Sequence, residues 1–302
     1  MINQKHCFSR TFISLIVLMT IGMMLILPKS VLADNGKKNE ITMSPAQDNI
    51  ELKAGQSFEG SFKIYNTGDE DFEFTVSASP YSVKGEEYQQ DFETQSEQTY
   101  LVDWIEFAQE KYFLKTKENV EVKYTVDVPK QIPAGGQYAV LFAETAGGTT
   151  GAILSNKRVG MLLYAKTDVN PVLEGRAEVP QIPKVKFNSN LSVKQIIENT
   201  GNTDFEAETT IKASTLLGRE VYSFTRPDTK IMPRSRRAVE MKWEGAPIMG
   251  LFNVNITTKF LDKTFEHSGW VLFISPIIMG AIALVIVALI LWKHYGRKKK
   301  NF

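Results

Sequence analysis

The stretch Ile64-Tyr-Asn-Thr-Gly-Asp-Glu-Asp-Phe-Glu-Phe74 returns later as Ile197-Glu-Asn-Thr-Gly-Asn-Thr-Asp-Phe-Glu-Ala207, with seven of eleven positions identical. In both places an alternating apolar run leads into Asn-Thr-Gly and a second run leads out, which is the pattern of strand, turn and strand. A glycine in such a short polar loop commonly supplies a positive φ. We therefore predict equivalent turns at Asn66 to Gly68 and at Asn199 to Gly201.

A second pair of matching segments supports an internal repeat. Pro133-Ala-Gly-Gly-Gln-Tyr138-Ala-Val140 resembles Pro247-Ile-Met-Gly250-Leu-Phe252-Asn-Val254. The first pair of matches is offset by 133 residues and the second by 114, so the first copy carries nineteen extra residues between its motifs. We expect each segment to turn a corner into a late strand, held by Pro133, Gly136 and Tyr138 in one copy and by Pro247, Gly250 and Phe252 in the other. Of the two aromatic residues, only Tyr138 has a hydroxyl that could fix the corner by a hydrogen bond.

Both copies consist of short alternating runs, and few segments show helical periodicity. Val120, Val122, Tyr124 and Val126, for example, alternate with more polar residues, as in a half-buried strand. Turn signals recur roughly every eight to twelve residues, as in β-sandwiches. The sequence thus predicts an all-β chain of two tandem immunoglobulin-like β-sandwiches, residues 41–172 and 173–267.

The two ends of the chain carry apolar segments. Lys5 and Arg10 precede an apolar run and a small-residue site that ends at Ala33, which predicts a cleaved secretory signal peptide over residues 1–33, with an uncleaved anchor as the alternative. Residues 270–292 carry no charge, are bracketed by tryptophans and precede the basic tail 293–302. This pattern predicts a transmembrane helix with a cytoplasmic C-terminus, and hence a single-pass cell-membrane protein with an extracellular ectodomain.

Charge and cysteine content restrict the partners and the compartment. The part between the two apolar segments holds 27 basic and all 34 acidic residues, a net charge of −7, which argues against nucleic acid as a partner. Cys7, the only cysteine, lies in the predicted signal peptide. The exported part therefore has no disulfide, and its stability must come from core burial.

The extra residues of the first copy, 81–111, are unlike their surroundings. Eight acidic residues and no basic one lie between Lys84 and Lys111, together with several aromatic residues, among them Tyr81, Tyr88 and Trp104. Thr94 and Glu97 could form a capping box ahead of a short helix. Two interpretations stay open: the aromatic residues cover one end of the sandwich, or they are exposed and bind a ligand through Tyr81, Tyr88 and Trp104.

The second copy contains a basic segment. Arg226 to Ala238 holds Arg226, Lys230, Arg234, Arg236 and Arg237, and residues 173–269 have a net charge of +2, against −9 for residues 34–172. We predict that Arg234, Arg236 and Arg237 bind an acidic partner or lipid headgroups.

The sequence lacks the residues that several kinds of catalytic and metal-binding site require. The three histidines, His6, His267 and His294, lie outside the bodies of both copies, so triads and histidine-metal sites are not expected. Crowded carboxylates such as Glu86, Glu87 and Asp91 are better explained as a solvated face than as a glycosidase pair. We expect no enzymatic activity, no metal and no cofactor.

The order of signal peptide, acidic immunoglobulin-like domain, second similar domain, membrane helix and lysine-rich tail resembles the WxL-interacting proteins of Gram-positive cell surfaces. The residues that carry the resemblance are the Leu52-Lys-Ala-Gly-Gln56 turn, the Asn66-Thr-Gly turn and the Pro133-to-Tyr138 corner. The resemblance implies an outer domain that binds peptidoglycan and a membrane-proximal domain that holds a partner protein.

Two functions of different classes follow. One is a non-catalytic, membrane-anchored surface protein that binds cell-wall peptidoglycan, a secreted surface protein, or both. The alternative is a structural spacer or assembly chaperone that presents a sandwich edge strand to a secreted subunit.

Overall fold

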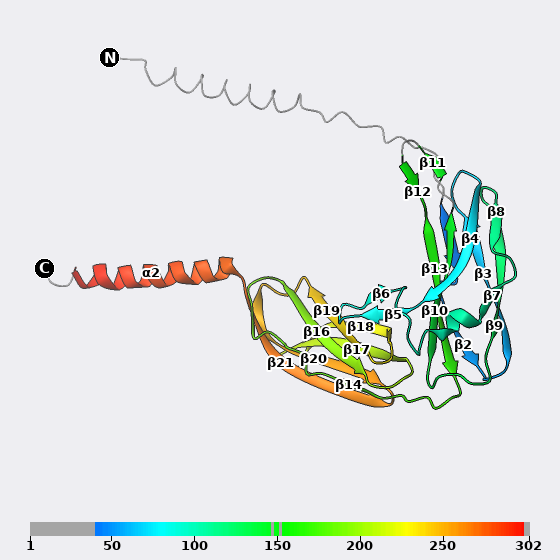
Figure 1. The fold of residues 1–302 in the computed structure, drawn as a ribbon. Coiled ribbons are helices and arrows are strands. Elements are labelled where there is room, and N and C mark those ends of the chain that lie inside the picture. The colour runs from blue at the N-terminus through cyan, green and yellow to red at the C-terminus, as the bar shows by residue number, and fades with distance from the viewer. Residues whose placement is uncertain (1–39, 146–147, 151–152, 299–302) are drawn as a thin grey trace, which may run out of the picture. The chain divides into compact units, whose positions relative to one another are not determined.

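The computed structural model describes residues 40–145, 148–150 and 153–298. Strands form most of this part, and they build two β-sandwiches in sequence order (Figure 1). The prediction of an all-β chain with immunoglobulin-like sandwiches is confirmed. The predicted signal peptide, residues 1–33, and the last four residues of the basic tail lie outside the described residues.

The first sandwich has a four-stranded and a five-stranded sheet. The four-stranded sheet has the order β1 (Ile41–Ser44), β3 (Ser57–Asn66), β9 (Asn119–Asp127), β7 (Ile105–Phe107). The five-stranded sheet has the order β2 (Gln47–Leu52), β13 (Arg158–Thr167), β10 (Gln137–Thr145), β4 (Phe72–Pro80), β8 (Lys111–Leu114). A ribbon of β5 (Ser82–Lys84) and β6 (Gln89–Asp91), a hairpin of β11 (Gly148–Thr150) and β12 (Ile153–Ser155), and the 3₁₀ helix η1 (Tyr100–Trp104) complete it.

The second sandwich has a three-stranded and a five-stranded sheet. The three-stranded sheet has the order β14 (Gly175–Ala177), β16 (Asn190–Asn199), β19 (Arg236–Glu244). The five-stranded sheet has the order β15 (Val185–Lys186), β21 (Lys263–Ile274), β20 (Met249–Phe260), β17 (Phe205–Thr215), β18 (Glu220–Ile231).

The two sandwiches share one strand order. In each, the second strand lies parallel to the last strand, β2 beside β13 and β15 beside β21, and all other pairs are antiparallel. The strands β3, β4, β8, β9, β10 and β13 correspond to β16, β17, β18, β19, β20 and β21. The strand β7, which covers the outer edge of β9, has no counterpart beside β19 among the described strands.

Each sandwich encloses its own core because apolar residues alternate with polar ones along the strands. In β9, for example, Val122, Tyr124 and Val126 are buried, and the charged residues between and beside them face water. Trp243 packs edge-on against Phe252 and Phe273 in the core of the second sandwich. The cores hold no disulfide and depend on this burial.

The C-terminal part corrects one sequence prediction. Residues 270–274 are not helical but form the end of β21, since their alternating side chains pair with β20 from Asn253 to Met249. The second sandwich therefore extends to Ile274, beyond the predicted boundary at residue 267. The helix α2 (Pro276–Lys298) begins at a proline, a residue that suits a first helical position.

Within the described part of the chain, no helix meets the length and hydropathy that crossing a membrane requires. The structure thus gives no support to the transmembrane helix predicted over residues 270–292.

Candidate functional site

The repeated turns are equivalent in their hydrogen bonds. The Asn66 amide donates to the carbonyl oxygens of Glu70 and Leu114, and its oxygen accepts from the Gly68 N–H. The Asn199 amide donates to the carbonyl oxygens of Thr203 and Ile231, and its oxygen accepts from the Gly201 N–H. Each asparagine thus ties its turn to the end of β8 or β18. Neither glycine has a positive φ, so that part of the prediction is wrong: the buried asparagine shapes the turn.

The corner segments are equivalent in their packing. A Cβ on Gly136 would collide with the ring of Tyr138, and a Cβ on Gly250 would collide with the ring of Phe252. In each copy the aromatic ring two residues later folds back over the glycine, which explains the shared Gly-x-aromatic pattern. Both rings are buried. Pro133 and Pro247 lie just before β10 and β20, the two strands that these corners enter.

The Tyr138 hydroxyl bonds to the second sandwich and not to its own corner. It donates to the Asp204 carboxylate and accepts from the Asp204 N–H, both at 2.9 Å. Asp204 also pairs with the Lys230 ammonium at 3.2 Å, and Lys230 reaches Asn49 of the first sandwich at 2.8 Å and the face of Tyr164 at 4.2 Å. Burial raises the pKa of Tyr138, and the nearby Asp204 carboxylate raises it further. The turn of the second repeat is therefore part of a buried junction between the sandwiches.

The β5–β6 ribbon forms the other half of this junction. The Met232 N–H donates to the Tyr88 hydroxyl at 2.6 Å, and the Arg237 guanidinium lies over the Tyr88 ring at 4.1 Å. The Ala238 N–H of β19 donates to the Glu86 carbonyl at 2.8 Å. At the exposed rim of the junction, Glu86 forms an ion pair with Arg236 and Glu87 forms one with Lys194. Two acidic residues of the insertion, Glu86 and Glu87, thus pair with basic residues of the second sandwich.

This junction changes the interpretation of the predicted binding residues. Tyr81 belongs to a buried cluster with Tyr138, Tyr164 and Met232. Trp104 does not lie on the predicted helix but ends η1, and it packs into the core of the first sandwich. Tyr88, Arg236 and Arg237 are engaged within the chain, which leaves only Arg234 exposed and without an ion pair among the described residues. Tyr81, Tyr88 and Trp104 are therefore not the exposed rings that ligand binding would need.

An open strand edge lies instead on the second sandwich, along β19. In the first sandwich the equivalent strand, β9, pairs with β7 from Tyr124 to Val126. In the second sandwich the ribbon contacts only the first residues of β19, through the side chains of Arg236 and Arg237 and one backbone hydrogen bond at Ala238. Farther along β19, the Tyr222 hydroxyl donates to the Lys242 carbonyl at 2.7 Å. Because bonding direction alternates along an antiparallel strand, the Glu240 and Lys242 N–H groups face the same open side as that of Ala238.

A groove of about 270 Å³ accompanies this edge. Its aromatic lining consists of Tyr222, which is stacked on Trp243 with ring centroids 5.4 Å apart, and of Phe224, which is exposed. The remaining lining is charged and of both signs: Arg226, Glu240, Lys242 and Glu244. The sequence analysis placed Arg226 in the basic segment but singled out none of the other groove residues, because the absence of a strand beside β19 becomes visible only when the two sandwiches are compared.

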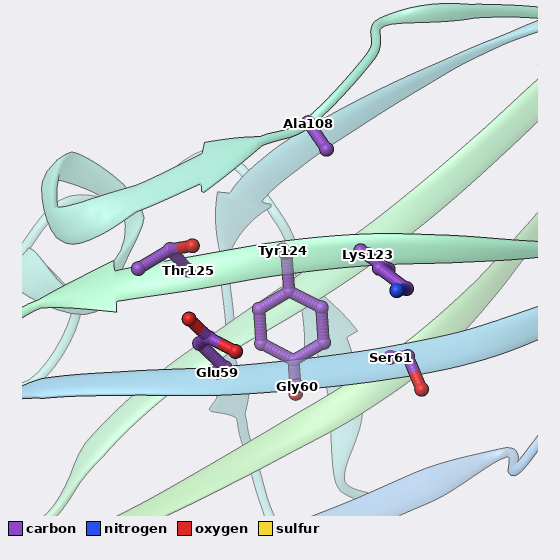
Figure 2. Close-up of a pocket in the computed structure, with 7 residues that line it drawn as sticks. All are labelled: Glu59, Gly60, Ser61, Ala108, Lys123, Tyr124 and Thr125. Carbon is purple, nitrogen blue, oxygen red and sulfur yellow. The ribbon is translucent and has the colours of Figure 1, made fainter.

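Two hollows lie on the first sandwich. One, of about 380 Å³, is lined by Glu59, Gly60, Ser61, Ala108, Lys123, Tyr124 and Thr125. Figure 2 shows the Tyr124 ring crossing β3 at Gly60, where a side chain would collide with it. Tyr124 is buried, so this hollow offers no exposed ring. The other, of about 410 Å³, contains the Phe113 ring, which is 58% exposed, beside Glu73, Thr75, Gln109 and Lys111.

The described residues include no group of three or more His, Cys, Asp or Glu that could hold a metal ion. The pKa of Asp91 is lowered, first by its bond to Lys84, which lies 2.7 Å away and holds the ribbon together.

No family model matches the chain, and no curated protein matches it. Among solved structures, the class 5 fimbriae chaperone CfaA is 12% identical, with a TM-score of 0.39 over 78% of this chain and 99% of that one. The E. coli chaperone DraB is 12% identical, with a TM-score of 0.38 over 76% of this chain and 96% of that one. A chain of the CsuC–CsuE chaperone–tip adhesion subunit pre-assembly complex from Acinetobacter baumannii is another match. It is 14% identical, with a TM-score of 0.37 over 67% of this chain and 90% of that one. TM-scores this low transfer no function to this chain.

Proposed function

We propose that this chain is a non-catalytic surface protein that captures an extended segment of a secreted protein on the open edge of β19. The observation that carries the proposal is the difference between the two sandwiches: β7 covers β9, and no described strand covers β19. The resemblance to WxL-interacting proteins, whose membrane-proximal domain is assigned to partner binding, agrees with a partner site on the second sandwich.

The chemistry of the edge specifies the form of the partner. Unpaired backbone groups along a strand edge bind another extended backbone, which adds to the sheet as a new strand. A segment paired along Val239 to Glu244 would lie over the groove and bring alternate side chains onto Tyr222 and Phe224. Charges of both signs at Arg226, Glu240, Lys242 and Glu244 would then favour a partner with complementary charges.

Two substitutions at one position test this proposal. Lys242→Pro removes the N–H that faces the open side, whereas Lys242→Ala keeps it and removes only the side chain. The full chain would be immobilised and exposed to proteins of the culture supernatant, with mass spectrometry of what is retained. We expect a specific protein to be retained by the wild type and by Lys242→Ala but lost from Lys242→Pro. Equal retention by the proline variant would rule out strand addition at β19.

A second candidate function is binding of cell-wall glycan on the first sandwich. The exposed Phe113 ring lies beside polar and charged side chains in this hollow, which is the combination of a sugar-stacking surface. Co-sedimentation of the full chain with insoluble peptidoglycan should weaken in Phe113→Ala and persist in Phe113→Tyr. If both variants sediment as the wild type does, this hollow is not a glycan site.

We also propose that the two sandwiches lie outside the cell, in agreement with the N-terminal apolar segment and the absence of cysteine after Cys7. Protease added to intact cells should then cleave the sandwiches. Protection in intact cells combined with cleavage after cell lysis would contradict this location.

A further inference from the structure

The outer face of the second sandwich becomes apolar toward one end. Leu251 of β20 pairs with Leu272 of β21, which pairs with Val185 of β15, so the three side chains form a row across the sheet. Met249 lies two residues before Leu251 on β20, and Trp270 lies two residues before Leu272 on β21, so both share this face on opposite sides of the row. These five residues, here called the apolar end, are between 38% and 58% exposed. Exposed Ile248 and Phe187 adjoin it in sequence.

The change in polarity is sharp and occurs along the strands. Farther from the apolar end, the same face of β20 carries Asn255, Thr257 and Lys259, and that of β21 carries Glu266 and Ser268. A one-sided antiparallel sheet normally keeps polar residues on its outer face throughout. Here the face is polar at one end and apolar at the other, and Trp270 stands where the two regions meet.

The apolar end continues directly into α2. The Ser275 N–H donates to the Ile248 carbonyl at 2.8 Å, and the Ser275 hydroxyl accepts from the Ile277 N–H at 3.2 Å. Ser275 therefore fixes the start of the helix to the strand that carries Met249 and Leu251. The first two-thirds of α2 is apolar and exposed, as Ile277 and Leu284 illustrate.

Basic side chains lie in the neighbouring segments. Lys184 and Lys186 flank Val185, and Arg219 lies in the β17–β18 hairpin beside the exposed Leu216 and Leu217. None of the three cations forms an ion pair within the described residues. The interface of an anionic bilayer binds this combination: exposed apolar residues, a tryptophan at their boundary and free cations nearby.

We propose that the apolar end rests on a lipid surface, with Leu251, Leu272 and Val185 in the acyl boundary and Trp270 at headgroup level. A protein partner would need an apolar surface that matches both the sheet end and the start of α2. A bilayer meets that requirement without a fixed shape. This inference concerns the end of the β20–β21 sheet and does not depend on strand capture at β19.

Site-specific fluorescence tests the inference on the full chain. In a Cys7→Ser background, Leu251→Cys and Thr257→Cys would each be labelled with an environment-sensitive fluorophore, and the protein would be placed in phosphatidylglycerol–phosphatidylcholine vesicles. The two positions share one strand and one face, about 20 Å apart. We expect a blue shift and several-fold stronger quenching by acyl-chain nitroxide lipids at position 251 than at position 257. Met249→Cys serves as a second probe if Leu251→Cys does not fold.

Three results would overturn the proposal. The first is equal quenching at positions 251 and 257. The second is a blue shift at position 251 that follows protein density and not lipid, which would indicate a second copy of the chain. The third is a blue shift that appears only after culture-supernatant proteins are added, which would indicate a protein partner. If the proposal is correct, Lys184→Ala combined with Lys186→Ala lowers the signal in anionic vesicles toward that in pure phosphatidylcholine.

Discussion

At the scale of single residues, the junction between the sandwiches depends on the hydrogen bonds of the Tyr138 hydroxyl with Asp204. Tyr138→Phe would leave the buried Asp204 N–H without its acceptor and remove one donor from the carboxylate. Because an unsatisfied buried polar group carries its full desolvation cost, we expect a loss of about 1–3 kcal/mol in the free energy of unfolding, measured by urea denaturation.

Tyr100→Phe is the control for this measurement. Its hydroxyl is in an exposed residue and makes no hydrogen bond among the described residues, so the change should stay within about 0.5 kcal/mol. Equal losses in the two variants would show that the Tyr138–Asp204 contact is not specifically stabilising.

Trp104 decides between the two interpretations of the insertion. Its side chain packs in the core of the first sandwich, so Trp104→Ala should lower the free energy of unfolding by about 3–5 kcal/mol. Tyr100→Ala, in the same 3₁₀ helix but exposed, should cost less than about 1 kcal/mol. A Trp104→Ala variant with wild-type thermal stability and weakened peptidoglycan retention would restore the ligand-binding interpretation.

For single residues, the sequence repeat predicts the contacts that the two sandwiches share but not the contacts in which they differ. Asn66 and Asn199 bond to residues at equivalent positions, as the repeat indicates. Asp71 and Asp204 occupy matching positions as well, yet Asp71 accepts from Thr116 within its own sandwich while Asp204 accepts from Tyr138 and Lys230. Sequence similarity fixes the position of a carboxylate but not which donors the tertiary structure brings to it.

At the scale of elements, the β5–β6 ribbon acts as a bridge and not as a free binding loop. Tyr88→Ala would remove the hydroxyl that accepts from the Met232 N–H and the ring under Arg237. We expect amide hydrogen exchange at Met232 and Ala238 to become about tenfold faster while the strands of each core keep their protection. Unchanged exchange at both amides would mean that the ribbon does not hold the second sandwich.

The tyrosines around this ribbon also predict a pH dependence. Burial raises the pKa values of Tyr81, Tyr88, Tyr138 and Tyr164 above the ordinary value of 10.0. Their contribution to stability is complete below pH 10 and is lost as the pH rises above it, because the unfolded chain then releases protons that the folded chain retains. Urea denaturation from pH 9 to 11 should show this fall, and Tyr164→Phe should make it shallower. An equal slope in that variant would contradict the assignment.

Strands were easier to predict than their ends and their neighbours. Alternation predicts the core strands, but the run from Trp270 to Ile274 also fits an apolar helix because its outward residues are as apolar as its inward ones. The unequal spacing of the repeated motifs predicts the insertion, since the second sandwich has no counterpart to it. Its contact with the second sandwich could not be predicted, because complementary charges in Glu86–Glu87 and in Lys194 and Arg236 do not by themselves identify a pair.

The whole described chain contains two separate cores joined by one shared cluster. Tyr81, Tyr138 and Tyr164 come from the first sandwich and Met232 from the second, so unfolding either sandwich exposes apolar surface of the other. Lys230 is a buried charge. If the first sandwich unfolds, its ammonium loses the hydrogen bond to Asn49 and the contact with the Tyr164 ring. Such sharing couples two folding units that could each fold around their own core.

We therefore predict that the two sandwiches unfold together in the wild type and separately once the junction is weakened. Trp104 lies in the first core and Trp243 in the second, so fluorine NMR of fluorotryptophan-labelled protein follows each sandwich without altering it. The two urea transitions should coincide in the wild type, as in a two-state system, and separate in the double variant Tyr88→Ala, Tyr138→Phe. Coincident transitions in the double variant would show that coupling comes from elsewhere, and separate transitions in the wild type would show that the junction does not couple the sandwiches. In the predicted case, a partner bound at β19 would also stabilise the first sandwich, because its binding energy would reach that core through Met232 and Lys230.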